Sequence, residues 1–144
     1  GIRVGCPAHN IIRTCTFSNI VISGFGTGIN IDNPKRYSCD GSKTSLDLMN
    51  IMFSNFTIDS NMWPVRIYVE DGLKLVNISD LTFSDFRTTS KYPLMIQGCK
   101  DSIIEDISFN NMQVATNGDD AIVCRYCRRV KMNNVELTNL KEPD

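Results

Sequence analysis

The stretch Leu48–Phe56, with the sequence LMNIMFSNF, contains the pattern that recurs along this chain. Counted from Phe53, apolar residues stand five and two positions before and three positions after, and an asparagine stands two positions after. The same frame fits five anchor residues, which follow one another at intervals of 36, 30, 26 and 28 residues: Phe17, Phe53, Phe83, Phe109 and Leu137. Internal repeats of this length are typical of folds in which each unit buries its apolar face against its neighbours.

Aligning the five copies places matching residues in columns. The three apolar columns read Ile12, Leu48, Ile78, Ile104, Met132 (five before the anchor); Cys15, Ile51, Leu81, Ile107, Val135 (two before); and Ile20, Phe56, Phe86, Met112, Leu140 (three after). The polar column, two after the anchor, reads Asn19, Asn55, Asp85, Asn111, Asn139. We expect these amides to be buried, where they can bond the backbone and the matching side chain of the next copy.

A second motif, apolar-x-apolar, follows each of the first four anchors by 11 or 12 residues: Ile29-Asn30-Ile31, Val65-Arg66-Ile67, Leu94-Met95-Ile96 and Ala121-Ile122-Val123, with Ile2-Arg3-Val4 opening the chain. Alternation of this kind is the period of a strand. The pattern therefore predicts an all-β fold, a right-handed single-stranded parallel β-helix (a solenoid) of about five coils, stacked about 4.8 Å apart. Leucine-rich repeats are the alternative, but their Leu-x-x-Leu-x-Leu core is absent.

Length and charge limit the possible partners. The chain has 144 residues, with 15 lysines and arginines against 16 acidic residues, a net charge of −1. This balance argues against nucleic acid as the main partner, and no apolar run reaches the length of a membrane span. We expect a single domain over residues 1–144. Because Gly1-Ile2-Arg3-Val4 already belongs to a strand and a solenoid needs a terminal cap, we expect the C-terminal portion of a longer protein.

The number and spacing of the cysteines do not predict a metal site. There are six: Cys6, Cys15, Cys39, Cys99, Cys124 and Cys127. Cys15 holds an apolar column position, so we expect a small buried side chain. The spacing Cys124-x-x-Cys127 is typical of zinc ligands, but there is no second pair and His9 is the one histidine. We expect no metal and no cofactor. A disulfide between Cys99 and Cys127, on adjacent coils, is compatible with the pattern, which does not decide it.

At the level of whole motifs, the chain resembles glycoside hydrolase family 28, the polygalacturonases and their relatives, which act on pectin. The resemblance lies in IRTCTFSNIVI, GINID, NIMFSNFTID, PVRI, NISDLTFSDF, PLMIQG and IEDISFNNMQV, and it covers nearly the whole chain as the C-terminal coils of that fold. It implies a secreted or periplasmic hydrolase of galacturonate-containing polysaccharide.

The resemblance also implies inverting hydrolysis by acidic residues on three consecutive coils, with the motifs Asn-Thr-Asp, Asp-Asp and Gly-His-Gly, followed by Arg-Ile-Lys. In one register, Gly1 ends the Gly-His-Gly coil, and Asn30 and Asp32 replace the basic pair of Arg-Ile-Lys. In the other register, Arg3 lies on the Arg-Ile coil and Gly5 replaces the lysine. Both registers put the catalytic acids before residue 1.

A local match offers different catalytic candidates. Asp119 and Asp120, in Gly118–Ile122, resemble the family's Gly-Asp-Asp motif. An inverting glycosidase needs two carboxylates about 6.5–9.5 Å apart, yet the matching residues one coil back are Tyr92 and Pro93. The alternative for Asp119 and Asp120 is a polar turn.

Candidate substrate-binding residues are the outward members of the short strands and the aromatic residues that precede them: Arg3, Asn30, Asp32, Arg66, Trp63 and Tyr92. Arginine binds a sugar carboxylate through paired hydrogen bonds, and sugar rings stack on aromatic faces. The alternatives are solvated surface charges and an aromatic column that only holds coils together.

The sequence thus predicts part of a glycoside hydrolase whose partner is an acidic polysaccharide, with no nucleic acid and no membrane. The alternative is a non-catalytic polysaccharide-binding or structural β-helix. A polysaccharide lyase ranks last, because it would need a calcium cluster of aspartates that neighbouring coils lack.

Overall fold

A computed structural model describes residues 1–5, 10–37 and 46–141, so Cys6, His9 and Cys39 lie outside the described residues. The described part is built from strands, apart from one 3-10 helix, Lys35–Tyr37. Five strands are short: Ile2–Arg3 (β1), Ile29–Asn33 (β3), Val65–Val69 (β5), Leu94–Gln97 (β7) and Ile122–Arg125 (β9). Five are long: Ile11–Gly24 (β2), Asp47–Ser60 (β4), Asn77–Ser90 (β6), Ile104–Thr116 (β8) and Cys127–Asn139 (β10).

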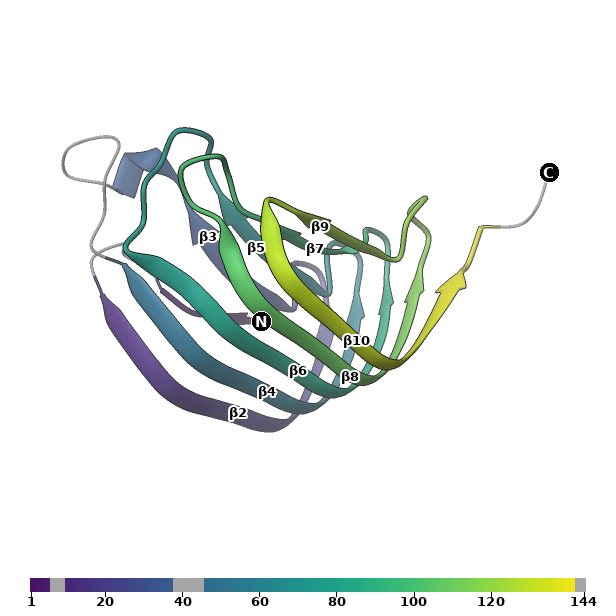
Figure 1. Ribbon diagram of the computed structural model, residues 1–144. Coiled ribbons are helices and arrows are strands. Elements are labelled where there is room, and N and C mark those ends of the chain that lie inside the picture. The colour runs from purple at the N-terminus through teal and green to yellow at the C-terminus, as the bar shows by residue number, and fades with distance from the viewer. Residues whose placement is uncertain (6–9, 38–45, 142–144) are drawn as a thin grey trace.

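The strands form two five-stranded sheets, and the chain passes alternately from one to the other (Figure 1). The short-strand sheet has the order β1-β3-β5-β7-β9, and the long-strand sheet has the order β10-β8-β6-β4-β2. Every pairing is parallel. The all-β prediction is therefore confirmed, as two parallel sheets whose inward faces share one apolar core.

The register between the long strands aligns the first four anchors as the repeat predicts. Phe17 pairs with Phe53, Phe53 with Phe83, and Phe83 with Phe109. Their rings stack with centroids 5.3, 5.2 and 5.5 Å apart. Phe56 and Phe86 form a parallel stack at 5.0 Å. Offset ring stacks of this kind add to the burial of apolar area, so the two columns form the centre of the core.

The fifth copy of the repeat was predicted five residues too late. Phe109 pairs with Met132, and Leu137 pairs with Val114 instead. The cause is the connection between the last two strands: β9 ends at Arg125 and β10 begins at Cys127, so Tyr126 alone links them. Because this link is short, the fifth copy of the repeat begins earlier in the sequence than the pattern predicts. An unrelated set of apolar residues five positions further on has the same spacing. The interval from Phe109 is thus 23 residues rather than 28.

The polar column was predicted at the correct place in four strands, but its side chains are exposed rather than buried. Its members all have positive φ: Asn19, Asn55, Asp85, Asn111 and Asn134, with φ of 60°, 59°, 58°, 53° and 54°. A second such column lies five residues earlier: Thr14, Asn50, Asp80, Asp106 and Arg129. Asparagine and aspartate adopt this left-handed conformation most readily after glycine, which explains why they fill eight of these ten positions.

The two left-handed columns bend every long strand twice, and the bends coincide from strand to strand (Figure 1). At each end of the second column the exposed amides still form a ladder. Asn55 Nδ2 donates to Asn19 Oδ1 at 2.8 Å, and Asn134 Nδ2 donates to Asn111 Oδ1 at 2.9 Å. The predicted bonding between copies is thus present in these two pairs, and the conformation of the backbone decides which residue types occupy the column.

Candidate functional site

The outward face of the short-strand sheet carries the substrate-binding residues predicted from the sequence. Because side chains alternate along a strand, every second residue of the short strands points away from the core. One outward column reads Arg3, Asn30, Arg66, Met95, Val123, and the next contains Asp32, Tyr68, Gln97 and Arg125. The prediction that Val123 points inward is wrong, because the register of β9 is shifted by one residue and gives Ile122 and Cys124 the inward positions. The inward neighbours Ile29, Ile31 and Ile67 are fully buried, which fixes this orientation.

Arg66 is the centre of a compact cluster on this face. Its guanidinium carbon lies 5.2 Å from the centroid of the Trp63 ring and 4.6 Å from that of Tyr68. Its Nη1 lies 3.3 Å from Asp32 Oδ1, and the side chains of Arg66 and Asp32 are only 22% and 18% exposed. Two aromatic rings and a carboxylate therefore hold the guanidinium in place, since cation–π contacts and an ion pair strengthen when water is partly excluded.

A third aromatic ring, that of Tyr92, extends this cluster along the stack of strands. The Trp63 and Tyr92 rings are 4.8 Å apart and tilted by 33°. Both precede a proline that enters a short strand, which places them at the same corner of successive repeats. Lys91 Nζ lies 5.3 Å from the Tyr92 ring centroid. Trp63 thus contacts Tyr92, as the predicted aromatic column requires, and it also contacts Arg66. Tyr68 was not foreseen, although its outward register beside Arg66 is readable from the alternation of β5.

Two hydrogen-bonding atoms in this region have no partner. Asn30 Oδ1 and Arg66 Nε are both inaccessible to solvent and unbonded, and their residues pair directly across β3 and β5. One is an acceptor and the other a donor. A buried polar atom without a partner is costly, so a small side-chain rearrangement that joined Asn30 Oδ1 to Arg66 Nε would stabilise this part of the face.

Asp119 and Asp120 lie on the connection between β8 and β9, at the corner that Trp63 and Tyr92 occupy in earlier repeats. The Asp119 side chain is 88% exposed, and its Oδ1 lies 2.5 Å from Lys141 Nζ. The hydrogen bond from Lys141, and then its positive charge, lower the pKa of Asp119. A general acid needs the opposite shift. The geometry thus fits a polar turn held by Lys141, and the catalytic role of Asp119 and Asp120 stays a prediction.

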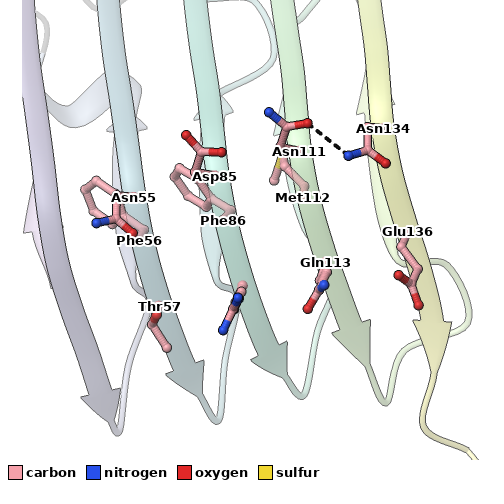
Figure 2. A pocket seen from close by; sticks show the side chains of 11 residues that line it. Asn55, Phe56, Thr57, Asp85, Phe86, Asn111, Met112, Gln113, Asn134 and Glu136 are labelled. Atoms are coloured by element: carbon pink, nitrogen blue, oxygen red, sulfur yellow. Dashed lines mark hydrogen bonds between the residues drawn. The ribbon is translucent and has the colours of Figure 1, made fainter.

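A groove on the long-strand sheet was not predicted. It has a volume of about 430 Å³ and crosses β4, β6, β8 and β10 at the second bend (Figure 2). One row along it is the left-handed column Asn55, Asp85, Asn111, Asn134, and the other is Thr57, Arg87, Gln113, Glu136. Its aromatic lining, Phe56 and Phe86, is buried beneath these polar rows. The groove therefore offers hydrogen bonds and mixed charge but no exposed ring.

Neither sheet brings together metal ligands. Within residues 1–5, 10–37 and 46–141, no three histidine, cysteine or acidic side chains form a group that could hold a metal ion. None of the helices in the same part of the chain is long and apolar enough to cross a membrane.

No protein-family model, curated protein or solved structure matches this chain. The resemblance to glycoside hydrolase family 28 therefore stays a prediction from the sequence. The function is argued from the outward face of the short-strand sheet and the groove on the long-strand sheet.

Proposed function

We propose that this chain is part of a polygalacturonase-like glycoside hydrolase that acts on pectin-like polysaccharide by inverting hydrolysis. In this proposal the chain binds the polysaccharide on the outward face of the short-strand sheet, and the catalytic acids lie outside its 144 residues. The observation that carries the proposal is the Arg66 cluster, in which the guanidinium contacts two aromatic rings, those of Trp63 and Tyr68.

The proposed fold of the whole is the right-handed parallel β-helix that the repeat predicts. Three features support it. All strand pairs are parallel, the chain alternates between two sheets, and strands two apart in sequence are neighbours in each sheet. Crossover connections between parallel strands of one sheet are right-handed almost without exception. In such a helix, a chain-like ligand lying along the stack meets equivalent positions of successive strands at intervals of about 4.8 Å.

The aromatic and cationic groups of the Arg66 cluster match the two chemical faces of an acidic sugar. The apolar face of a pyranose ring packs on an aromatic ring, and Trp63 and Tyr92 place two such rings 4.8 Å apart. A uronate carboxylate requires a cation, and arginine is the side chain best suited to it. The two outward columns contain Arg3, Arg66 and Arg125 against a single carboxylate, Asp32. This excess of positive charge favours an acidic polysaccharide over a neutral one.

The position of the carboxylates supports binding rather than chemistry on this part of the face. Inverting hydrolysis uses a proton donor and a base about 6.5–9.5 Å apart. Asp32 is paired with Arg66, and Asp119 is paired with Lys141, whose hydrogen bond lowers the pKa of that carboxyl. These two ion pairs also favour the second candidate, a non-catalytic polysaccharide-binding β-helix, which would use the same face without turnover.

Calorimetric titration with short oligogalacturonates at low salt tests the binding face. We expect Arg66→Ala and Trp63→Ala each to weaken binding about tenfold, the order of one charge-assisted or stacking contact. Arg87→Ala is the matched control, because it removes the same charge from the groove of the long-strand sheet. Equal loss in Arg66→Ala and Arg87→Ala would show that net charge alone attracts the ligand and would contradict the proposal.

Release of reducing ends from polygalacturonate separates binding from catalysis. We expect none from this chain. Turnover that disappears in Asp120→Asn would instead place the catalytic acid on the connection between β8 and β9.

A further inference from the structure

Two cysteines occupy adjacent core positions in the last repeat. Cys124 pairs with Ile96 between β9 and β7, and Cys127 pairs with Ile104 between β10 and β8. The corresponding residues of the preceding repeat are therefore two isoleucines, almost wholly inaccessible to solvent. Both cysteines pack against the same apolar core from its end. The last repeat thus carries a pair of thiols where the repeat before it carries a pair of aliphatic side chains.

The link between the strands brings the two thiols together. Only Tyr126 separates β9 from β10, and its φ of 53° turns the chain sharply between the two sheets. Cys127 Sγ lies 3.3 Å from the carbonyl oxygen of Arg125 and 3.6 Å from that of Ile96, the register partner of Cys124. The corresponding residues Ile96 and Ile104 stand eight positions apart in the sequence, whereas the cysteines stand three apart.

The thiols interact and are accessible. A hydrogen bond from Cys127 lowers the pKa of Cys124, and the same interaction raises the pKa of Cys127. Both side chains are partly exposed, because β9 and β10 are the last strands of their sheets. Cys99, by contrast, is buried, and its Sγ is 3.3 Å from the carbonyl oxygen of Leu73. A thiol of lowered pKa with a second thiol beside it is the arrangement that reacts with disulfides.

We propose that Cys124 and Cys127 form a dithiol–disulfide pair, a redox modification site that low-molecular-weight disulfides oxidise and that links β9 covalently to β10. The Cys124 thiolate attacks one sulfur of the oxidant, forms a mixed disulfide and expels the other sulfur as a thiolate. Cys127 then loses its proton and attacks the Cys124 sulfur, which expels the second thiolate. In total, the pair gives up two protons and two electrons, and the oxidant is reduced to two thiols.

Peptide mapping of the whole chain with trypsin tests the pairing directly. Trypsin cleaves after Arg125, so Cys124 falls in the peptide 101–125, Cys127 in 126–128 and Cys99 in 92–100. After incubation with oxidised glutathione and blocking of free thiols, we expect 101–125 and 126–128 to be linked. Their joint mass should be lower by two hydrogen atoms than the sum of the reduced peptides, and a reductant should separate them. A link from either peptide to 92–100, or two unlinked and unmodified peptides, would overturn the proposal.

Single substitutions test the order of the two steps. We expect Cys127→Ser to accumulate glutathione on Cys124, because the second thiol is no longer there to displace it. Cys15→Ser is the control, since Cys15 is a partly exposed thiol at the opposite end of the stack, and it should leave the 101–125/126–128 link unchanged. Loss of the link in Cys15→Ser, or glutathione found only on Cys127, would contradict the mechanism. The wild-type map decides the pairing even if a variant does not fold.

Discussion

The middle and the ends of the strand stack are built from the same repeat, yet the same column positions have different surroundings. In β4 and β6, the anchors Phe53 and Phe83 are fully buried, with stacked rings on both sides. In β2, Phe17 has one ring neighbour and is only partly buried, and in β10 the anchor position holds Met132, which is 52% exposed. A repeat therefore specifies where a side chain points, and the neighbouring repeats decide how much that side chain stabilises the fold.

The anchor column gives the largest expected difference between middle and end. Phe53→Ala removes a ring packed between two others, so we expect a loss of about 3–5 kcal/mol in the free energy of unfolding. Phe17→Ala makes the same chemical change at the end of the same column and should cost about 1–2 kcal/mol, because less apolar area is lost from the core. Urea denaturation of both variants measures the difference. Equal losses would mean that the end strand is as well packed as the centre.

The left-handed columns should show no such gradient, because backbone strain is local. Asn111 in β8 and Asn134 in β10 have φ of 53° and 54° and share one hydrogen bond. We expect Asn111→Ala and Asn134→Ala each to cost about 1–2 kcal/mol, the penalty of a left-handed alanine. The glycine variants lose the same hydrogen bond without the strain and should cost less.

Denaturation of all four variants separates the strain from the hydrogen bond. A much smaller cost at Asn134 than at Asn111 would show that β10 does not hold this backbone conformation in solution.

A buried hydroxyl in the middle of the stack offers a gain in stability. Thr88 in β6 is 3% exposed, its Oγ1 has no hydrogen-bond partner, and its register neighbours are Ile58 and Val114. Thr88→Val replaces the hydroxyl with a methyl group of similar size, so we expect unfolding to require about 1 kcal/mol more. Thr89→Val, at the exposed neighbouring position, is the control and should change little. No gain in Thr88→Val would indicate a bound water at Oγ1.

The sequence was most informative where the repeat is regular. Phe17, Phe53, Phe83 and Phe109 fell into one column, because intervals of 26 to 36 residues still leave the frame within each strand unchanged. The position of the fifth copy was predicted wrongly, because the single-residue link at Tyr126 shortens the repeat and the residues around Leu137 have the spacing of an anchor. The predicted burial of Asn55 and Asn111 was wrong for a different reason. An asparagine column is compatible with a buried ladder and with a left-handed bend, and only the backbone conformation distinguishes these two structures.

The candidate site was partly predictable on the same grounds. Alternation placed Arg3, Asn30 and Arg66 on one outward column, and the shared Trp-Pro and Tyr-Pro positions placed Trp63 beside Tyr92. The pairing of Arg66 with Asp32 depends on side-chain conformations across two strands, which no pattern encodes. The groove beside Asp85 depends on a bend that recurs at the same position in neighbouring strands, and positive φ cannot be read from residue types alone.

The smallest expected effect concerns the ion pair that joins the last two long strands. Arg129 Nε lies 2.6 Å from Asp106 Oδ1, and Nη2 lies 3.1 Å from Oδ2. These hydrogen bonds, followed by the charges of Arg129 and Lys131, hold the pKa of Asp106 below its usual value of 3.8. A carboxyl whose pKa is depressed by folding stabilises the protein above its unfolded pKa, and this contribution is lost as the pH falls through its folded pKa. We therefore expect the contact between β8 and β10 to weaken only below about pH 4.

Titration of the Asp106 carboxyl by NMR measures this interaction without unfolding the chain. Arg129→Met keeps the aliphatic stem and removes the hydrogen bonds, so the pKa of Asp106 should rise toward its usual range. Lys131→Met is the control, because Lys131 acts only through its charge and is the weakest of the causes. Its removal should raise the pKa of Asp106 less than removal of Arg129 does. Equal rises in the two variants would mean that β10 in solution does not hold Arg129 against Asp106, and that the end of the stack is looser than its register with β8 implies.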